Sequence, residues 1–331
     1  MTGEPLLRVE DLTVALRVDA GLVALIDSVS FSLDSGRVLA LVGESGSGKS
    51  VTALSLMRLL PNAMRIHEGS INFRSRRAGT VDLAALRPYG REMRSIRGSE
   101  IGMIFQEPMA SFSPVHTIGE HIADVLRAHT DLNSKAVRER AIEMLDRVQI
   151  ADPRRAVDRY PHEFSGGMRQ RAMIAKALCC GPALLIADEP TTALDVTIQA
   201  QVLELMLELQ TEFEMAIIFI THDLGVVAQI ADEVAVMYTG KLIEQGDKRA
   251  VFRQPAHPYT RELLAATPRL GRNGAAELRT IRGNVPGLLD LPSGCTFHPR
   301  CDSFIHGCCE LHEPEDRYLS EEHRVSCHLY D

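Results

Sequence analysis

One glycine-rich segment, GESGSGKS at residues 43–50, constrains what this chain can fold into more than any other stretch. It follows the apolar run VLALV and precedes VTALSLMRLL, an order that predicts a buried strand, a tight loop and a helix. Its three glycines let the backbone turn sharply, so that successive N–H groups can point at phosphate oxygens. The segment therefore predicts a phosphate-binding loop (P-loop) in an α/β fold.

The charged and hydroxyl groups of this loop have expected partners. Lys49 would neutralise the β- and γ-phosphates of a nucleotide, and the Ser50 hydroxyl would ligate Mg²⁺. The residues expected at the nucleotide are Gly43, Glu44, Ser45, Gly46, Ser47, Gly48, Lys49, Ser50 and Val51. A glycine-rich turn with a chance Lys-Ser pair is the alternative, which the flanking strand and helix disfavour.

A second apolar run, LLIADEP at residues 184–190, ends in two carboxylates. Ligands of α/β sheets bind at the carboxyl ends of the strands, so both acids are expected near the nucleotide. Asp188 would hold the magnesium shell, and Glu189 would orient or deprotonate the attacking water. Alone, the acids could equally cap a helix. Together with the P-loop they indicate nucleotide hydrolysis.

A third segment, FSGGMRQRAMIAKAL, predicts a helix whose start at Ser165, Gly166 and Gly167 can bind an anion. An ordinary serine cap is the alternative. Two such helix starts in one chain suggest that one γ-phosphate uses both. We therefore expect two subunits to pack head to tail, each offering this segment to the other's nucleotide.

The rest of the chain predicts alternating strands and helices. The apolar runs RVLALVG, EIGMIF, ALLIAD and MAIIFIT are typical of a largely parallel sheet covered on both faces. Residues 134–150 have helical spacing, and 233–247 predict two short strands joined at Gly240. Past residue 250 prolines interrupt the pattern. We place a boundary near Lys248, between a large domain at 1–248 and a small, loop-rich domain at 249–331.

Six motifs in this order, GESGSGKS, FQEP, FSGGMRQR, LLIADEP, ALD and THD, resemble those of ATP-binding-cassette (ABC) ATPases over residues 6–248. The resemblance implies a P-loop NTPase fold with a RecA-like core, an antiparallel β subdomain and a helical subdomain. It also implies ATP and Mg²⁺ as cofactors, and ATP hydrolysis as the activity.

The same resemblance implies roles for single residues. Gln106 would sense Mg²⁺ and the attacking water, Asp195 would lie in the D-loop, and His222 would be the switch histidine near the γ-phosphate. The implied catalytic residues are Glu189, His222 and Gln106, and the implied Mg²⁺ ligands are Ser50, Gln106 and Asp188. The signature residues implied to act across the dimer are Ser165, Gly166, Gly167 and Gln170.

One position departs from the family pattern. The family usually has an aromatic side chain near the end of the first strand, which stacks on adenine, whereas this chain has Leu16 there. An aliphatic surface can still cover a purine, but aromatic stacking of about 1 kcal/mol would be lost. We therefore expect loose discrimination between bases.

Sequence outside these six motifs narrows the resemblance to one group of importers. FQEPMASFSPVHTIGEHI at 105–122 resembles subunits that energise peptide and nickel importers, with Phe112 and Ser113 in place of the usual Leu and Asn. HPYTRELLAATP at 257–268 and GCTFHPRC resemble the C-terminal extension of the same family. This implies the first ATPase subunit of a dipeptide/oligopeptide importer, with nickel, opines or sugars as alternative solutes.

That resemblance also implies partners and a location. The partners would be a second, similar ABC ATPase subunit, two transmembrane permease subunits and, indirectly, an extracytoplasmic solute-binding protein. The chain would be a peripheral protein on the cytoplasmic face of the inner membrane. No apolar run approaches the roughly 20 residues of a membrane-spanning helix, and the N-terminus lacks the pattern of a signal peptide.

Five of the seven cysteines follow residue 290, and in a reducing compartment such a cluster indicates a metal site rather than disulfides. Spacing alone leaves zinc and an iron–sulfur cluster open. The resemblance implies a [4Fe–4S] cluster, with Zn²⁺ as the alternative. The implied ligands are Cys295, Cys301, Cys308 and Cys327. Cys309 competes with Cys308, which keeps the family spacing.

Other cysteines and histidines have simpler expected roles. Cys179 and Cys180 are expected to be small buried residues. His298, His306 and His312 are expected to be surface histidines rather than ligands.

Two other classes of function are disfavoured. A soluble ABC ATPase acting on nucleic acid or ribosomes would usually carry two cassettes, long coiled coils or basic arms, whereas this chain has one cassette and a formal net charge of −8. We therefore expect no nucleic acid among its partners. An iron–sulfur sensor with an inactive cassette is disfavoured because Lys49, Asp188, Glu189 and His222 are all present.

Overall fold

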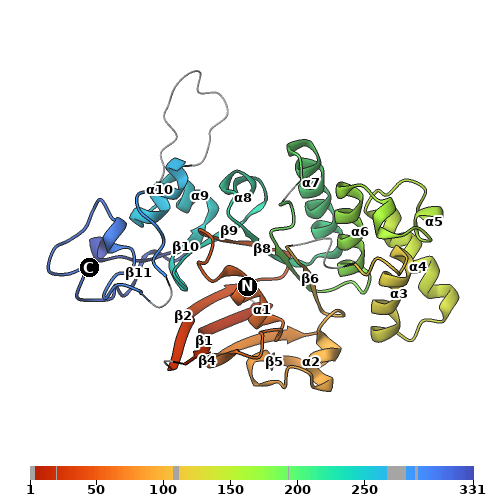
Figure 1. Cartoon of the computed structure of the whole chain (residues 1–331), viewed down its shortest axis with the longest axis horizontal. Coiled ribbons are helices and arrows are strands. Elements are labelled where there is room, and N and C mark those ends of the chain that lie inside the picture. Colours follow the sequence, from red (N-terminus) through yellow and green to blue (C-terminus); the bar gives the residue numbers. More distant parts are fainter. Residues whose placement is uncertain (1–3, 20, 107–111, 193, 267–280, 288–289) are drawn as a thin grey trace. The chain divides into compact units, whose positions relative to one another are not determined.

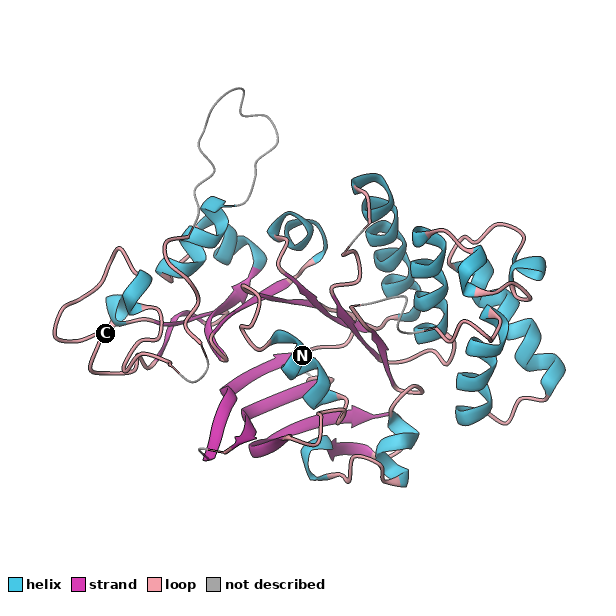
Figure 2. Ribbon diagram, in the orientation of Figure 1, coloured by secondary structure: helices cyan, strands magenta, loops and turns pink. Residues whose placement is uncertain are grey.

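The computed structural model describes residues 4–19, 21–106, 112–192, 194–266, 281–287 and 290–331. The chain forms two compact units. Its helices and strands are drawn in Figures 1 and 2. The P-loop unit comprises Leu7–Ser32, Val38–Asn72 and Ile220–Asp331. The helical unit comprises Met1–Leu6, Leu33–Arg37 and Phe73–Phe219.

Five strands of the P-loop unit pair one after another. β3 (Val38–Val42) pairs in parallel with β9 (Glu233–Tyr238), which pairs antiparallel with β10 (Lys241–Asp247). β10 then pairs with β12 (His323–Ser326), and β12 with β11 (Asp316–Ser320), both antiparallel. All five residues of β3 are buried, as its unbroken apolar run predicts.

The other regular elements of the P-loop unit lie before and after this series. They are β1 (Leu7–Val18), β2 (Gly21–Leu33, whose last residue belongs to the helical unit), α1 (Lys49–Leu56), most of β4 (Met64–Ser75), α8 (Leu224–Ile230), α9 (Lys248–Arg253), α10 (Pro258–Ala266), and the 3-10 turns η3 (His298–Arg300) and η4 (His328–Tyr330). β1 lies between β2 and β4 in their sheet.

The predicted pair of strands at 233–247 is confirmed, and the chain turns between them at Thr239 and Gly240. Gly240 has a φ of +84°, and a Cβ there would lie 2.6 Å from the carbonyl oxygen of Leu25. Only glycine combines this backbone conformation with so close an approach. The turn therefore holds β9 and β10 against the β2 backbone.

Two parallel strands and a group of helices form most of the helical unit. β6 (Ile101–Ile104) pairs in parallel with β7 (Leu184–Asp188), which confirms two predicted strands and their direction. The predicted helix at 134–150 is confirmed as α4 (Ser134–Arg147). The other elements are β5 (Gly79–Asp82), η1 (Leu83–Ala85), α2 (Arg91–Ile96), α3 (Ile118–His129), α5 (Pro153–Ala156), η2 (Pro161–Glu163), α6 (Gly166–Leu178) and α7 (Val196–Phe213). Figure 1 shows α3, α4 and α6 packed together.

The fourth predicted strand is β8 (Ala216–Thr221), and all of its residues are buried. Cys179 is buried and Cys180 is half-buried. Among the described helices, none has the length and apolar character needed to cross a lipid bilayer.

The C-terminal extension, residues 249–331, shares its core with the P-loop unit. Tyr259 and Phe297 are fully buried in one apolar cluster with Ala40, Val42 and Tyr238. In the described residues 281–287 and 290–315, the regular structure is the short turn η3, in keeping with the predicted loop-rich character. The domain boundary near residue 248 stays a prediction, since the extension lies in the same compact unit as the P-loop.

A buried carboxylate of β10 holds two parts of the extension against that strand. The Glu244 side chain is fully buried and accepts hydrogen bonds from the backbone N–H groups of Ala256 (2.7 Å) and His257 (2.8 Å). It also contacts the His323 Nε2 at 2.8 Å. A buried charge is stable only when such donors satisfy it. Glu244 thus fixes β10, the start of α10 and β12 relative to one another.

We predict that His257 makes stability depend on pH. Its Nδ1 accepts the N–H of Tyr259 at 3.0 Å, and burial lowers the pKa of His257 to about 3. A histidine in the unfolded chain binds its proton near pH 6.5. The contribution of neutral His257 to the free energy of unfolding is therefore complete above that pH. This contribution is lost as the pH falls towards 3, at about 1.4 kcal/mol per pH unit. His257→Asn keeps an acceptor, so the free energy of unfolding in urea should depend less steeply on pH.

The matched control is His67→Asn, which removes a histidine whose side chain is 47% exposed. It should keep the wild-type slope between pH 7.5 and about pH 4.5. An unchanged slope in His257→Asn would contradict this account.

Candidate functional site

The P-loop surrounds the ammonium group of its own lysine. Lys49 is 6% exposed, and its Nζ donates to the carbonyl oxygens of Gly43 and Glu44, both at 2.8 Å, and to the Ser47 Oγ at 3.2 Å. Ser50, by contrast, is exposed at the start of α1. The loop therefore presents one buried cation and one accessible hydroxyl beside a helix N-terminus. The first turn of α1 carries no acidic residue that would oppose an anion.

Glycine is required where the loop touches β9. Gly43 has a φ of +154°, and a Cβ there would lie 2.2 Å from the carbonyl oxygen of Met237 and 2.7 Å from the Ser47 Oγ. Gly46 and Gly48 also take positive φ, at +80° and +102°. The N–H of Gly240 donates to the Ser47 carbonyl at 3.0 Å. The strand turn thus supports the loop from one side, and Ser45 and Gly46 remain exposed on the other.

In the helical unit, the predicted glutamine and the two predicted carboxylates lie at the ends of two parallel strands. Gln106 follows β6 and Glu189 follows β7, so both reach the same edge. The Gln106 Nε2 donates to the Glu189 Oε2 at 3.0 Å, and the Thr192 Oγ1 donates to the same oxygen at 2.9 Å. Asp188, the last residue of β7, is buried at 6% exposure. The structure therefore brings Gln106 and Glu189 together, as expected of a pair acting on one water.

Glu189 has a strained backbone. Its φ of +47° lies in the left-handed region, which costs a residue other than glycine about 1–2 kcal/mol. The turn is closed by the Thr192 N–H, which donates to the Glu189 carbonyl at 3.2 Å. Strain of this kind persists where the surroundings hold a side chain in place, and here they hold a carboxylate beside Gln106.

The signature segment lies beside the start of α7. The Ser165 side chain caps α6 by accepting the N–H of Met168 at 3.3 Å. A Cβ on Gly167 would lie 2.8 Å from the Ile198 Cγ2, so this glycine permits close packing of the two helix starts. Asp195 caps α7 by accepting the Ile198 N–H at 3.0 Å and is exposed. Ser165, Gly166 and Asp195 therefore share one exposed edge of the helical unit.

Gln170 does not share that exposure. It is 1% exposed, and its Nε2 has no hydrogen-bond partner within the described part of the chain. The residue lies one turn into α6, on the buried side of the helix. The structure does not offer this side chain to a nucleotide on another subunit. The signature residues that remain candidates for contact with a nucleotide on another subunit are therefore Ser165, Gly166 and Gly167.

The remaining predicted residues occupy separate places. His222 is exposed directly after β8 in the P-loop unit, and Asp223 caps α8 beside it. Leu16 is half-buried within β1. The FQEP motif lies partly in residues 107–111, and 257–268 ends in residues 267–268, both outside the described residues. Ala193 of the ALD motif also lies outside them.

Four cysteines of the extension gather around one backbone contact. The Cys295 N–H donates to the Cys309 carbonyl at 2.8 Å. Gly294 permits this approach, since a Cβ there would lie 2.3 Å from the same oxygen. Burial raises the pKa of the Cys295 thiol to about 11, and the neighbouring thiols of Cys309, Cys327 and Cys301 add to the rise. The group is thus Cys295, Cys301, Cys309 and Cys327, of which Cys309 and Cys327 are buried.

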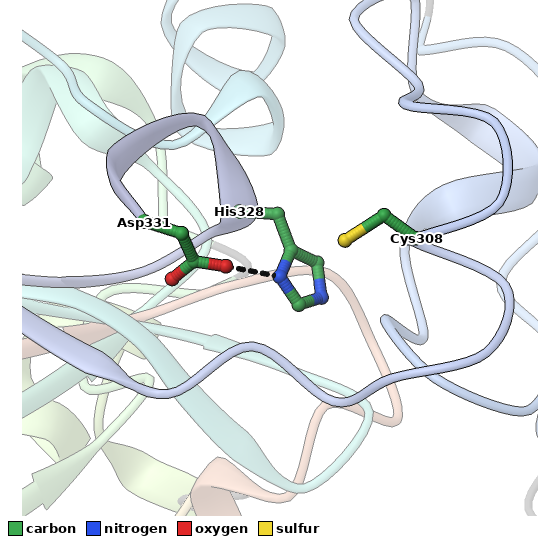
Figure 3. Close-up of side chains that lie close together, drawn as sticks. All are labelled: Cys308, His328 and Asp331. Atoms are coloured by element: carbon green, nitrogen blue, oxygen red, sulfur yellow. Dashed lines mark hydrogen bonds and ion pairs between the residues drawn. The ribbon is translucent and has the colours of Figure 1, made fainter.

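Cys308 points into a different group. Its sulfur lies with side-chain atoms of His328 and Asp331, all within 4.8 Å of one another (Figure 3). The His328 Nδ1 contacts the Asp331 Oδ2 at 2.6 Å, and its Nε2 contacts the His312 carbonyl oxygen at 2.9 Å. Burial lowers the pKa of His328, but these hydrogen bonds outweigh it and raise the pKa above its usual value. An imidazolium that donates from both nitrogens has no lone pair for a metal.

Neither His328 nor Asp331 was predicted as a ligand, because the spacing of the two residues carries no ligand signal. His298 and His306, expected at the surface, have protein partners. The His298 Nδ1 contacts the Cys295 carbonyl oxygen, and His306 pairs with Glu310. Within the described residues, no three cysteine sulfurs lie within 4.8 Å of one another. Four thiolates on one zinc would lie about 3.8 Å apart, given Zn–S bonds of about 2.3 Å.

Comparisons with known proteins identify the family of this chain. A family model described as "ABC transporter" matches residues 26–192, and one described as "Oligopeptide/dipeptide transporter, C-terminal region" matches residues 243–308. An ATP-binding protein assigned to peptide import in Brucella abortus is 51% identical over 333 residues, covering 99% of this chain and 98% of its own. The chain belongs to the ABC transporter ATP-binding family.

Two further relatives have names that specify a solute class. The dipeptide transport ATP-binding protein DppD of Bacillus subtilis is 48% identical over 329 residues, covering 99% of this chain and 96% of its own. The oligopeptide transport ATP-binding protein OppD of Salmonella typhimurium is 50% identical over 303 residues, covering 92% and 88%. As a member of this family, the chain is an ATP-binding ATPase with the oligopeptide/dipeptide type of C-terminal region.

Solved structures confirm the predicted P-loop α/β fold. The dimeric ATP-binding cassette MJ0796 bound to ADP and Pi matches with a TM-score of 0.64 at 23% identity, covering 73% of this chain and 98% of that one. The protein cbiO1 of Clostridium perfringens matches with a TM-score of 0.62 at 27% identity, covering 76% and 92%.

We predict that Gly43→Ala weakens MgATP binding at least tenfold. The new Cβ meets the Met237 carbonyl oxygen at 2.2 Å, so the loop must leave its support on β9. A loss of about 1.4 kcal/mol in the binding free energy gives this factor. Calorimetric titration of the purified chain measures it.

The matched control is Gly79→Ala. Gly79 also has a positive φ, +71°, but a Cβ there meets nothing within 4 Å. This variant tests backbone strain without a clash, and its affinity for MgATP should match that of the wild type. Equal affinities in Gly43→Ala and the wild type would contradict the prediction.

Proposed function

We propose that this chain is the ATP-hydrolysing subunit that energises peptide import through a membrane ABC transporter. The observation that carries the proposal is the pairing of an ABC cassette with the oligopeptide/dipeptide type of C-terminal region in one chain. Relatives covering nearly the whole chain are named for peptide, dipeptide or oligopeptide transport. Nickel, opines or sugars would be the alternative solutes of the same motor.

The P-loop would hold the phosphates of ATP. Lys49 is ready for this role because its Nζ now bonds loop carbonyls that phosphate oxygens can replace. The exposed Ser50 hydroxyl would take a place in the Mg²⁺ shell, together with Asp188 and Gln106. The bound metal would neutralise charge on the phosphates. With Leu16 in the position of the adenine-stacking ring, base discrimination would be loose.

Hydrolysis would depend on Glu189. Its carboxylate would accept a proton from the attacking water, and Gln106, which already donates to that carboxylate, would orient the water. The strained Glu189 backbone supports this role, since strain is typical of side chains fixed for chemistry. His222 would act near the γ-phosphate as the switch histidine.

The exposed edge formed by Ser165, Gly166 and Asp195, with the half-buried Gly167 beside it, would act across a dimer. This edge supports the proposal because its helix start is open to an anion from outside the unit. The solved relative bound to ADP and Pi is itself dimeric. The partner would be a second, similar ABC ATPase subunit.

ATP-driven closure of this dimer would move two transmembrane permease subunits. A solute-binding protein on the far side would deliver the peptide. The chain would therefore work as a peripheral protein at the cytoplasmic face of the inner membrane.

We further propose that residues 249–331 form an accessory region that a [4Fe–4S] cluster cross-links. The ligands would be Cys295, Cys301, Cys309 and Cys327, with Cys309 in place of the Cys308 that sequence spacing favours. Cys309 is buried beside the other three, whereas Cys308 lies with His328 and Asp331. No three of the cysteine sulfurs in the described residues lie as close together as the ligands of one zinc ion would. This wider spacing suits a cluster held by four thiolates. The bound cluster would supply cross-links to a region with little regular structure.

We predict that Glu189→Gln abolishes peptide uptake and lowers ATP hydrolysis at least a hundredfold, while MgATP binding is retained. Loss of a general base typically costs 10²–10⁴ in rate, and the amide keeps the shape and one acceptor. Uptake of labelled dipeptide, oligopeptide and nickel would be compared in a deletion strain complemented with each variant.

Glu204→Gln is the control, since it removes an exposed carboxylate from α7 and should restore uptake fully. Restoration of nickel uptake without peptide uptake would overturn the peptide assignment. Full peptide uptake with Glu189→Gln would overturn the role of Glu189.

We predict that the anaerobically purified chain carries about four irons, with matching sulfide and visible absorption. Cys309→Ser should lose this iron, whereas Cys308→Ser should keep it, because only the buried thiol lies with the other three. Iron, sulfide and zinc analysis of both variants decides the ligand. A colourless protein with one zinc would contradict the cluster, and iron loss only in Cys308→Ser would restore the assignment made from spacing.

A further inference from the structure

An arginine of the extension binds the side chain of a P-loop residue. Arg300 belongs to η3, between Cys295 and Cys301, and its side chain is 4% exposed. Its Nη1 donates to the Glu44 Oε2 at 2.8 Å, and its Nη2 donates to the Glu44 Oε1 at 3.2 Å. This two-pronged pair joins residues 256 positions apart in the chain. Forked geometry of this kind fixes orientation as well as charge.

The guanidinium is held in place from the other sides as well. The Arg300 Nε donates to the Arg282 carbonyl at 2.7 Å, and its Nη1 lies 3.3 Å from the Tyr238 hydroxyl. The rings of Tyr238 and Phe297 lie 5.7 and 5.9 Å from the guanidinium carbon. Arg300 therefore has one arrangement, set by the core that the extension shares with β9.

The extension supplies partners for Glu44 at both its backbone and its side chain. The Glu44 N–H donates to the Tyr259 hydroxyl at 2.9 Å, and its carboxylate binds Arg300. Its carbonyl oxygen accepts from Lys49 within the loop. A change in the extension is thus transmitted to the residue that begins the turn of the P-loop.

We propose that Arg300 is a positioning residue of the nucleotide site, which cancels the charge of Glu44 beside the phosphates and couples the cysteine-bearing extension to ATP affinity. The inference rests on the proposed nucleotide site at the P-loop. Without Arg300 the Glu44 carboxylate, 28% exposed, would repel an incoming triphosphate. Coupling is reciprocal, so MgATP must stabilise the Arg300 segment as much as that segment favours MgATP.

A double-mutant cycle tests this in the purified full-length chain, with MgATP affinity measured by calorimetric titration. Arg300→Met keeps the packing on Tyr238 and Phe297 but removes the charge, and should weaken binding about tenfold. Glu44→Gln removes the repelling charge and is the reference for the second half of the cycle. The double variant should bind MgATP within about threefold of Glu44→Gln, because the loss of Arg300 then leaves no unpaired carboxylate beside the phosphates.

Rescue in the double variant separates charge compensation from a merely structural role. If Arg300 had only a structural role, the double variant would bind MgATP as weakly as Arg300→Met or more weakly. The matched control is Arg317→Met, which removes an arginine of the extension that pairs with Glu315 and Asp331. It should bind MgATP like the wild type. Arg300→Lys, which keeps the charge and loses the fork, covers the case that Arg300→Met does not fold, and should bind more weakly than wild type.

A second readout tests the reciprocal effect. MgATP should slow amide hydrogen exchange in residues 297–301 of the wild type, and should slow it less in Arg300→Met. Equal MgATP affinity in the wild type and the Arg300 variants would overturn the inference and leave the proposed function standing. Failure of rescue in the double variant would also overturn it. Failure of the wild type itself to bind MgATP would overturn both.

Discussion

The contact between the P-loop and β9 is the constraint on which the nucleotide site depends. At Gly43 the loop backbone comes so close to the Met237 carbonyl that no side chain fits between them. The loop can therefore turn its N–H groups outward only while β9 stays in register with β3. Gly240 extends the same requirement to the next turn, where its N–H supports the Ser47 carbonyl.

Buried polar groups join the extension to this framework, in addition to the apolar cluster that the two share. Glu244 binds two backbone N–H groups and His323, and Arg300 binds Glu44. Each of these charges would cost several kcal/mol if its partners were lost, so alternative placements of the extension are disfavoured. Directional contacts therefore specify one arrangement in a segment whose loops bury few apolar side chains.

Sequence patterns identified the elements with local signals. The strands around the P-loop and before Glu189 were predictable because buried parallel strands have unbroken apolar runs, and the P-loop because its spacing is dictated by phosphate geometry. The Arg300–Glu44 pair was not predictable, since nothing local marks partners 256 residues apart. The burial of Gln170 and of Cys309 also escaped prediction. Spacing says which residues are near in sequence, whereas the helix phase and the turn at Gly294 decide which side chains face inward.

The position of Arg300 would give the cysteines a role beyond the proposed one of holding loops together. Cys295 and Cys301 flank its turn, and both pack against the apolar cluster that contains Tyr238, Tyr259 and Phe297. Whatever fixes these two thiols also fixes the guanidinium that binds Glu44, because only five residues lie between them. A group bound by the thiols and a nucleotide bound by the P-loop would then stabilise the same arrangement of Arg300. The free energy of one binding event would thereby favour the other, with no movement larger than the ordering of a single turn.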